Sequence, residues 1–277
     1  MIMDRYSVLM SVYVKENSKY LDMSIESMVE QTIKPEQIVI VEDGELTEEL
    51  YNVVGKYRKR YPEMFTVVSY KANKGLGKAL DIGLKNCRND LVARMDSDDI
   101  SVKDRCEREL MLFENDKDLS IVSGNVAEFV DEVDNIISIR NVPEYQEKIK
   151  KRMRTRSAFN HPAVMYRKSE VERCGGYGKL KRKQDHDLFS RMMNRGCKAY
   201  NIQDIILYFR ADENNLKRRK SWVNCKSYII AQWNIFKRHE CNCWELLYVI
   251  CAQLFFRIAP TRTIAFVTRK FLRREKE

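Results

Sequence analysis

Residues 37–44 read Gln-Ile-Val-Ile-Val-Glu-Asp-Gly, four apolar residues followed by two carboxylates and a glycine. A strand buried on both faces of a parallel sheet has this continuous apolar character, whereas a half-exposed strand alternates. Residues 6–14 and 91–95 repeat the pattern, and the second of these runs leads into Asp96-Ser97-Asp98-Asp99. The sequence therefore predicts three buried strands, two of which end in clustered carboxylates.

Amphipathic segments separate these predicted strands. Asn17 and Ser18 are favourable caps for a helix that ends before Pro35. A helix over 50–60, a strand over 65–69 and a helix over 78–87 continue the alternation of strand and helix. Four alternations of strand and helix predict an α/β fold with a mostly parallel sheet flanked by helices. Ligands of such sheets bind beyond the carboxyl ends of the strands, where the carboxylates lie.

The chain changes character beyond residue 144. A basic helical stretch over 148–156, a short strand over 163–166 and a helix over 184–194 are expected there, and the chain after residue 210 has helical character to its end. We expect no sharp domain boundary before about residue 211, because no linker composition interrupts the sequence.

The net charge of +10 hides an uneven distribution. Residues 1–144 hold 19 Lys/Arg and 28 Asp/Glu, a net of −9, and residues 145–277 hold 31 and 12, a net of +19. This division favours a metal-binding pocket facing an anionic partner. Nucleic acid is disfavoured as a partner, because the basic runs 148–156 and 179–183 have almost no aromatic residues on which bases could stack.

The eight cysteines are scattered and contain no CxxC pair. With no secretory signal pattern at the N-terminus, we expect reduced thiols and a cytoplasmic location. His239, Cys241 and Cys243 lie close in sequence, but this spacing strains tetrahedral zinc binding, so packed thiols are favoured.

Three motifs contain side chains that are suited to catalysis or ligand binding. Carboxylates in Asp96–Asp99 are suited to Mg²⁺ or Mn²⁺, although a solvated acidic turn has the same composition. The loop Asn73–Lys78 fits neither the dinucleotide fingerprint nor the Walker pattern, yet its lysines could meet a diphosphate. Asp185, in the first turn of a predicted helix, is either a dipole-stabilising residue or a general base.

The order and spacing of these motifs resemble one enzyme family over roughly residues 5–220. The resemblance is to inverting family 2 glycosyltransferases of the GT-A (Rossmann-like) fold, particularly bacterial enzymes that build exopolysaccharide, capsule or lipopolysaccharide. It rests on Y-S-V-L-M-S-V-Y (6–13), S-I-E-S-M-V-E-Q-T-I-K-P-E-Q-I-V-I-V-E-D-G (24–44), N-K-G-L-G-K-A-L (73–80), A-R-M-D-S-D-D (93–99), N-H-P-A-V-M (160–165), G-G-Y (175–177) and Q-D-H-D-L-F-S-R (184–191).

The resemblance implies a role for individual residues. Asp96 and Asp98 match the DXD motif that holds a divalent metal, Mn²⁺ or Mg²⁺, and Asp185 matches the catalytic base. His161 and Gln184 fall in the acceptor region, and Gln184 replaces the usual glutamate before the base. The nucleotide site would be formed by Ser11, Tyr13, Glu16, Asp43, Lys74, Gly75, Arg94 and Asp96, with Asp43 on the base, usually uracil.

The resemblance also implies the partners and the domain organisation. The donor would be a nucleotide sugar, usually a UDP-sugar, and the acceptor a glycan or a polyprenyl-diphosphate-linked glycan. Residues 1–100 would bind the nucleotide and residues 101–220 the acceptor. Residues 221–277 lie beyond the resemblance, and their own sequence pattern predicts a helical extension. Two alternatives remain: a nucleotidyltransferase of the sugar-nucleotide pyrophosphorylase type, although no glycine-rich loop follows the first strand, and a nucleotide-sugar-binding protein without catalysis.

The C-terminal tail suggests a further partner. Residues 244–256 are nearly all apolar but too few to span a bilayer. Residues 257–277 hold seven Lys/Arg and two acidic residues interleaved with apolar ones. A basic amphipathic helix on an anionic membrane surface fits this pattern, and so does packing of the apolar face on the protein. We therefore expect a peripheral protein on the inner face of the cytoplasmic membrane.

Overall fold

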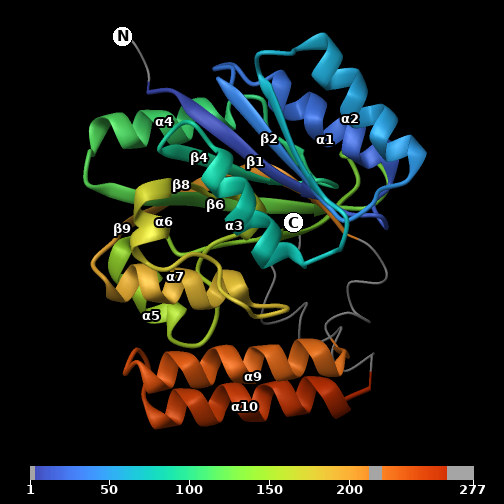
Figure 1. Ribbon diagram of the computed structural model, residues 1–277. Helices are drawn as coiled ribbons and strands as arrows, with labels where there is room; N and C mark the ends of the chain where they lie inside the picture. The colour runs from blue at the N-terminus through green and yellow to red at the C-terminus, as the bar shows by residue number, and fades with distance from the viewer. Residues whose placement is uncertain (1–3, 212–219, 261–277) are drawn as a thin grey trace.

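The computed structural model describes residues 4–211 and 220–260, which form one mixed sheet covered by helices on both faces (Figure 1). The sheet order is β3-β2-β1-β4-β8-β6-β9-β5, and β7 pairs with β6. The strands are β1 Tyr6–Val12, β2 Gln37–Asp43, β3 Phe65–Tyr70, β4 Leu91–Asp96, β5 Ile100–Ser101, β6 Leu119–Phe129, β7 Ile136–Arg140, β8 Met165–Arg167 and β9 Lys198–Arg210.

The sheet divides the apolar core into two layers, and helices cover the layer on each face. The apolar faces of α1, α2 and α4 pack on one side, and those of α3, α5, α6 and α7 on the other. The helices are α1 Ser18–Val29, α2 Glu48–Arg60, α3 Leu76–Asn86, α4 Arg105–Asn115, α5 Gln146–Met153, α6 Lys168–Arg173, α7 Gln184–Asn194, α9 Trp222–Lys237 and α10 Cys243–Ile258, with a 3-10 turn, η1, at His161–Ala163.

The predicted alternation of strand and helix is confirmed through residue 96, and β1, β2, β3 and β4 pair in parallel. Beyond β4 the pairing is mixed: β6 and β9 are parallel, whereas β8 is antiparallel to both β4 and β6. The predicted helix 184–194 is confirmed, and the helices α9 and α10 agree with the helical character expected after residue 210.

Two predicted elements are displaced. The strand expected over 163–166 is Met165–Arg167, because Pro162 has no N–H for a ladder and the chain forms the 3-10 turn first. The basic helix expected over 148–156 is Gln146–Met153. The division at residue 220 stays a prediction, and the tail residues 261–277 lie outside the described residues.

A buried arginine fixes the end of β4 to η1. Arg105 is fully buried, and its guanidinium donates to the carbonyl oxygens of Arg94 (3.0 Å), Pro162 (3.2 Å) and Val164 (3.2 Å). Its Nε donates to Glu109 at 3.2 Å, which offsets the buried charge. Because hydrogen bonds from a charged donor in the interior are strong, this side chain holds β4 and η1 together just before residues 96–99.

The helix α3 packs so closely on the sheet that one of its residues has no room for a side chain. A Cβ on Gly83 would overlap Leu9 Cδ1 and lie 2.6 Å from Val41 Cγ2. We predict that Gly83→Ala lowers the free energy of unfolding by about 1–3 kcal/mol, because both neighbours are held in the sheet. Gly55, in the interior of α2, is the matched control: nothing lies within 4 Å of its added Cβ.

Chemical denaturation of the two variants gives the measurement. Gly55→Ala should raise the free energy of unfolding by about 0.4–1 kcal/mol, because alanine restricts the unfolded chain. Equal effects of the two substitutions would contradict the close packing of α3 on β1 and β2.

The C-terminal helices form an antiparallel hairpin beneath α7 (Figure 1). Arg238 at the end of α9 donates to Asp187 of α7 at 2.9 Å, and Ser190 of α7 donates to Glu240 at 2.8 Å. The helix α10 packs on α9 and forms the outer layer (Figure 1). None of the described helices has the length and apolar character that crossing a bilayer demands.

Candidate active site

Turns at the carboxyl ends of the parallel strands meet at one edge of the sheet. Ser11, near the end of β1, is in register with Val41 of β2 on one side and with Asp96 of β4 on the other. The parallel pairing therefore brings the carboxylates that follow β2 and β4 to either side of the β1 terminus, as the sequence predicts.

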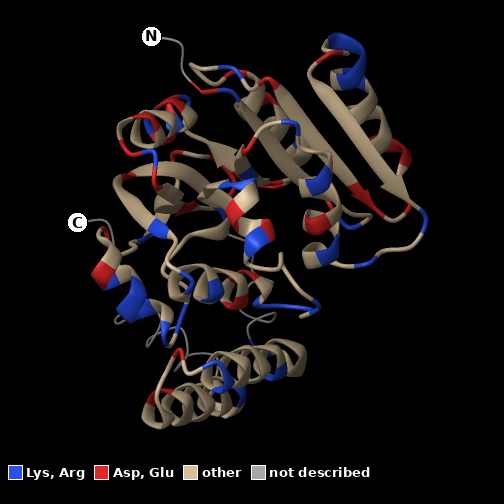
Figure 2. Ribbon diagram, turned by 60° about the vertical axis from the view of Figure 1, so that its left-hand side comes forward, with Lys and Arg blue, Asp and Glu red and all other residues tan. Residues whose placement is uncertain are grey.

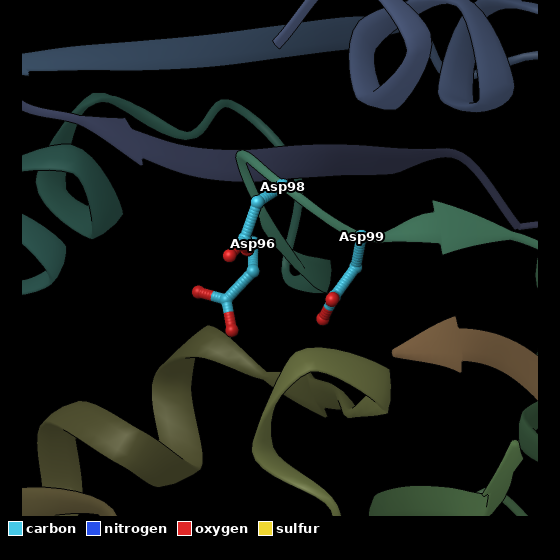
Figure 3. A group of neighbouring side chains, drawn as sticks. All are labelled: Asp96, Asp98 and Asp99. Atoms are coloured by element: carbon cyan, nitrogen blue, oxygen red, sulfur yellow. The ribbon is translucent and has the colours of Figure 1, made fainter. Parts of the chain in front are cut away.

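Three carboxylates gather after β4. Asp96, Asp98 and Asp99 each have an oxygen within 4.8 Å of the others, and their side chains point to the same side of the turn (Figure 3). Burial and the charges of Asp96 and Glu16 raise the pKa of Asp98 to about 7. The Asp99 Oδ2 atom is buried without a hydrogen-bond partner among the described residues. Three crowded carboxylates, of which Arg94 pairs directly with Asp96 alone, offer the oxygen ligands that a hard divalent cation prefers.

The turn after β1 is tied to this carboxylate cluster. The Ser97 hydroxyl donates to Glu16 Oε2 at 2.6 Å, and the Ser24 hydroxyl of α1 donates to the Asp96 carbonyl at 2.7 Å. Tyr13 lies in the same turn and is partly exposed. Glu16 and Tyr13, both predicted site residues, therefore lie beside the carboxylate cluster.

Arg94 lies under the cluster rather than at its surface. Its side chain is buried, its Nη2 donates to Asp96, and its Nε and Nη1 have no hydrogen-bond partner among the described residues. Burial acts to lower the pKa of this arginine, but the Asp96 charge outweighs burial and raises the pKa. Arg94 therefore orients Asp96 from behind, and its predicted contact with the nucleotide stays a prediction.

Arg210, at the end of β9, was not identified from the sequence. Its backbone N–H donates to Asp99 Oδ1 at 2.9 Å and its Nε to the Asp98 carbonyl at 3.0 Å. Its guanidinium also packs over the rings of Tyr20 and Phe129. The antiparallel pairing of β5 with β9 creates these contacts across more than 100 residues of sequence, so no local signal could have indicated them.

Asp43 organises the loop between β3 and α3. Its carboxylate accepts from the backbone N–H groups of Lys74 (2.7 Å) and Gly75 (3.0 Å) and from the Tyr70 hydroxyl (2.8 Å). Gly75 has a φ of 83°, which a residue with a side chain rarely adopts. The loop that the sequence associates with a diphosphate is therefore pinned beside the end of β2.

A neutral histidine lies on the opposite side of the site. Burial, followed by the nearby charge of Arg94, lowers the pKa of His161 to about 3. Its Nε2 lies 3.0 Å from the Tyr177 hydroxyl. The backbone N–H of Tyr177 donates to Asp81 of α3 at 2.8 Å, a contact that links the two halves of the chain. The sequence motif Gly-Gly-Tyr indicated Tyr177 as part of the resemblance but not this role.

The N-terminus of α7 presents the predicted base. Burial acts to raise the pKa of Asp185, but its interactions with neighbouring groups, among them the charge of Lys183 and the backbone N–H of His186, outweigh burial, so its pKa lies below the ordinary value. Gln184 packs against α3, since a Cβ on Gly77 would lie 3.3 Å from its Cγ. Asp185 is therefore an ionised carboxylate next to the loop that Asp43 pins.

The second candidate metal site, at His239, Cys241 and Cys243, is not brought together as a group of ligands in the part of the chain that the structure describes. Within residues 4–211 and 220–260, Asp96, Asp98 and Asp99 are the one group of three ligand side chains found. Cys241 is buried and accepts from Gln232 at 3.2 Å, whereas Cys243 and His239 are exposed.

Comparisons with known proteins agree with this geometry. Residues 7–175 match the family model Glycosyl transferase family 2. A glycosyltransferase of Haemophilus influenzae, described as uncharacterized, is 36% identical over 274 residues, 98% of this chain and 100% of the relative. The UDP-Gal:alpha-D-GlcNAc-diphosphoundecaprenol beta-1,3-galactosyltransferase of Escherichia coli is 34% identical over 272 residues, 98% of this chain and 97% of the relative.

A solved structure extends the likeness to the fold. Mannosyltransferase PcManGT from Pyrobaculum calidifontis, in complex with GDP-Man and Mn²⁺, superposes with a TM-score of 0.65 over 96% of this chain and 75% of that chain. Its sequence identity is 15%, so this likeness concerns the fold alone.

Proposed function

The chain belongs to glycosyl transferase family 2, and from this premise we propose that it moves a sugar from a UDP-sugar to a hydroxyl of a glycan or lipid-linked acceptor, with inversion, in surface polysaccharide assembly. Membership of the family makes it a glycosyltransferase with the GT-A fold. The observation that carries the finer proposal is the convergence of the Asp96–Asp98 carboxylates, the pinned 73–75 loop and Asp185 at one edge of the sheet.

The donor would lie over the ends of β1, β2 and β4. Asp43 and Tyr13 would contact the base, and Lys74 and Gly75 the ribose and diphosphate; the hydrogen bonds from Lys74 and Gly75 to Asp43 support this by holding these residues together. Uridine as the nucleoside is supported by the E. coli relative, whose name specifies UDP-Gal. Arg94 supports this arrangement indirectly by orienting Asp96.

Asp98 and Asp96 would hold a divalent cation, Mg²⁺ or Mn²⁺, in the carboxylate cluster. Such a cation, when bound, neutralises the charge of the diphosphate leaving group. The backbone N–H of Arg210 holds Asp99, which lies behind Asp96 and Asp98. The raised pKa of Asp98 and the unpartnered Asp99 oxygen support the fit, because the first reflects burial beside other carboxylates and the second is an oxygen that no donor among the described residues meets.

Asp185 is the proposed general base. The acceptor hydroxyl attacks the anomeric carbon from the face opposite the diphosphate, its proton passes to a carboxylate oxygen of Asp185, and the bond to the diphosphate breaks as UDP leaves. A single displacement of this kind inverts the anomeric configuration. The lowered pKa of Asp185 keeps the carboxylate ionised at neutral pH. His161, which is neutral, and Gln184 border the place where the acceptor would bind.

The acceptor is proposed to carry a lipid diphosphate. The E. coli relative is named for a GlcNAc-diphosphoundecaprenol acceptor, and it matches nearly the whole chain. The basic second half of the chain is suited to such an anionic acceptor.

Incubation with UDP-galactose or UDP-GlcNAc, Mn²⁺ and a GlcNAc-diphospholipid tests the proposal. We expect a product with one added sugar whose anomeric proton coupling shows the β configuration from an α-linked donor. A nucleotide-sugar-binding protein without catalysis would bind UDP but give no product with any donor. A product with retained configuration would contradict the single displacement at Asp185.

A further inference from the structure

The outer face of the C-terminal hairpin is apolar along its whole length. On α10 the exposed positions recur at intervals of three and four residues and include no charged side chain. Trp244, Tyr248 and Ile258 are 75%, 65% and 80% exposed. The exposed face of α10 is completed by Leu247, Cys251, Leu254 and Phe255. Sixteen helical residues extend about 24 Å, which is a long apolar surface to leave in water.

The tryptophans of the chain are concentrated here. The sequence has three, Trp222 and Trp233 on α9 and Trp244 on α10, and all three are exposed. Tryptophan is not a residue that a water-facing surface favours, whereas it is enriched at the boundary between lipid and water. The hairpin therefore has both the apolar stripe and the aromatic residues of a surface that lies in a membrane interface.

The charges around this face are mainly positive. Residues 220–260 hold five Lys/Arg and two acidic residues. Both acidic side chains are engaged: Glu240 accepts from Ser190 and pairs with Arg238, and Glu245 caps α10 and pairs with Arg154. In Figure 2 the hairpin is mostly tan, the colour of residues other than Lys, Arg, Asp and Glu. No acidic side chain among residues 220–260 is exposed to oppose an anionic surface.

A basic cavity opens beside the turn of the hairpin. It has a volume of about 610 Å³ and lies between α5, α7 and the turn that joins α9 to α10. Its basic lining residues are Lys148, Lys150, Lys151 and Arg154, from α5 or the residue after it, and His239 comes from the turn. Glu147 and Glu240 also line the cavity, but the basic residues remain in excess. The basic groups are placed to meet phosphates at the rim of the apolar face.

We propose that the α9–α10 hairpin lies in the interface of an anionic phospholipid membrane, with its apolar face among the acyl chains and the α5 lysines on the phosphates. A second copy of the chain is a poorer occupant, because a two-fold contact would bring the positive rims of two hairpins together. The proposal deepens the proposed function, on which it rests for the lipid-linked acceptor, and it identifies described residues, in place of the basic tail alone, as the membrane contact.

Vesicle binding of the full-length protein provides the test. We expect co-sedimentation with phosphatidylcholine–phosphatidylglycerol vesicles and much less with phosphatidylcholine alone. Because all three tryptophans lie in the hairpin, their emission should shift to the blue on binding, and brominated phospholipid should quench it.

Matched double variants identify the surface. Leu247→Glu/Leu254→Glu places two charges on the apolar face and should weaken vesicle binding by about tenfold or more. Met111→Glu/Ile137→Glu makes the same charge change at comparably exposed apolar positions outside the hairpin, and should leave binding within about twofold. All four positions are exposed, so thermal unfolding of both variants should match the parent protein.

Four results would overturn the proposal. The parent protein could fail to bind anionic vesicles, or both double variants could bind equally well. Deletion of residues 261–277 could abolish binding while Leu247→Glu/Leu254→Glu does not, which would place the contact in the tail. If the parent protein were a dimer that Leu247→Glu/Leu254→Glu dissociates, and if neither protein bound vesicles, the face would be an interface between copies of the chain. Transfer to a water-soluble acceptor, measured on the same variants, reports separately on the proposed function.

Discussion

Replacing Asp185 by asparagine should lower kcat for sugar transfer by about 10²–10⁴-fold, because the amide cannot accept the acceptor proton at neutral pH. Binding of UDP should change little, since Asp185 lies at the N-terminus of α7 and the nucleotide is proposed to lie over β1, β2 and β4. Steady-state transfer, together with calorimetric titration of UDP, separates the two effects. Because the pKa of Asp185 is lowered, the base itself should stay ionised as the pH falls through 6, and a fall of the parent rate there should be relieved by more Mn²⁺, since the pKa of Asp98 is about 7.

The matched control is Asp187→Asn, two residues along the same helix. Asp187 accepts from Arg191 at 3.1 Å and from Arg238 at 2.9 Å, so it holds the hairpin against α7. This variant should lose about 1–3 kcal/mol of unfolding free energy and retain most of kcat. If Asp185→Asn keeps the parental kcat, or if the two variants exchange their effects, the assignment of the base is wrong.

Replacing Asp98 by asparagine should reduce metal-dependent transfer by about a thousandfold, since several kcal/mol of charge stabilisation of the leaving diphosphate would be lost. The variant should also lose the effect of Mn²⁺ on the affinity for UDP. Folding should persist, because one of three crowded carboxylates is neutralised and their mutual repulsion falls.

Asp118→Asn provides the control for Asp98→Asn, since it removes the same charge from an exposed side chain outside the cluster. It should leave both transfer and the Mn²⁺ effect unchanged. Titration of UDP with and without Mn²⁺ on both variants gives the comparison. Persistence of the Mn²⁺ effect in Asp98→Asn would show that the cation binds elsewhere.

Local patterns explain why the first half of the fold could be predicted. The strands β1, β2 and β4 are continuous apolar runs, and the carboxylates that follow them meet because parallel strands end at the same edge. The strand β6 was not predicted, although all eleven of its residues are buried. Its Ser, Gly, Asn and Glu side chains interrupt the apolar run, and long-range pairing with β8 and β9 decides its structure.

In the candidate site too, residues within local motifs could be predicted from the sequence, whereas their long-range contacts could not. The sequence identified Asp96, Asp98 and Asp185 by motif, and these are the residues closest to the proposed chemistry. The supporting contacts of Arg210 with Asp99, and of Asp81 with Tyr177, join residues about 100 positions apart and have no sequence signature. Asp43 was predicted to contact the nucleotide base; the structure shows it bound to the 73–75 loop, and the contact with the base stays a prediction.

Thermal unfolding of the parent protein with nucleoside diphosphates, in the presence and absence of Mn²⁺, tests the proposed donor and cation most directly. At a concentration of UDP about a hundred times its Kd, binding adds about 2.7 kcal/mol of stability, which corresponds to a rise of about 5 °C in Tm. We predict this rise for UDP with Mn²⁺, a smaller one without the cation, and little change with GDP. The absence of any shift with any nucleoside diphosphate, with or without Mn²⁺, would contradict a nucleotide-sugar site at the carboxyl ends of β1, β2 and β4.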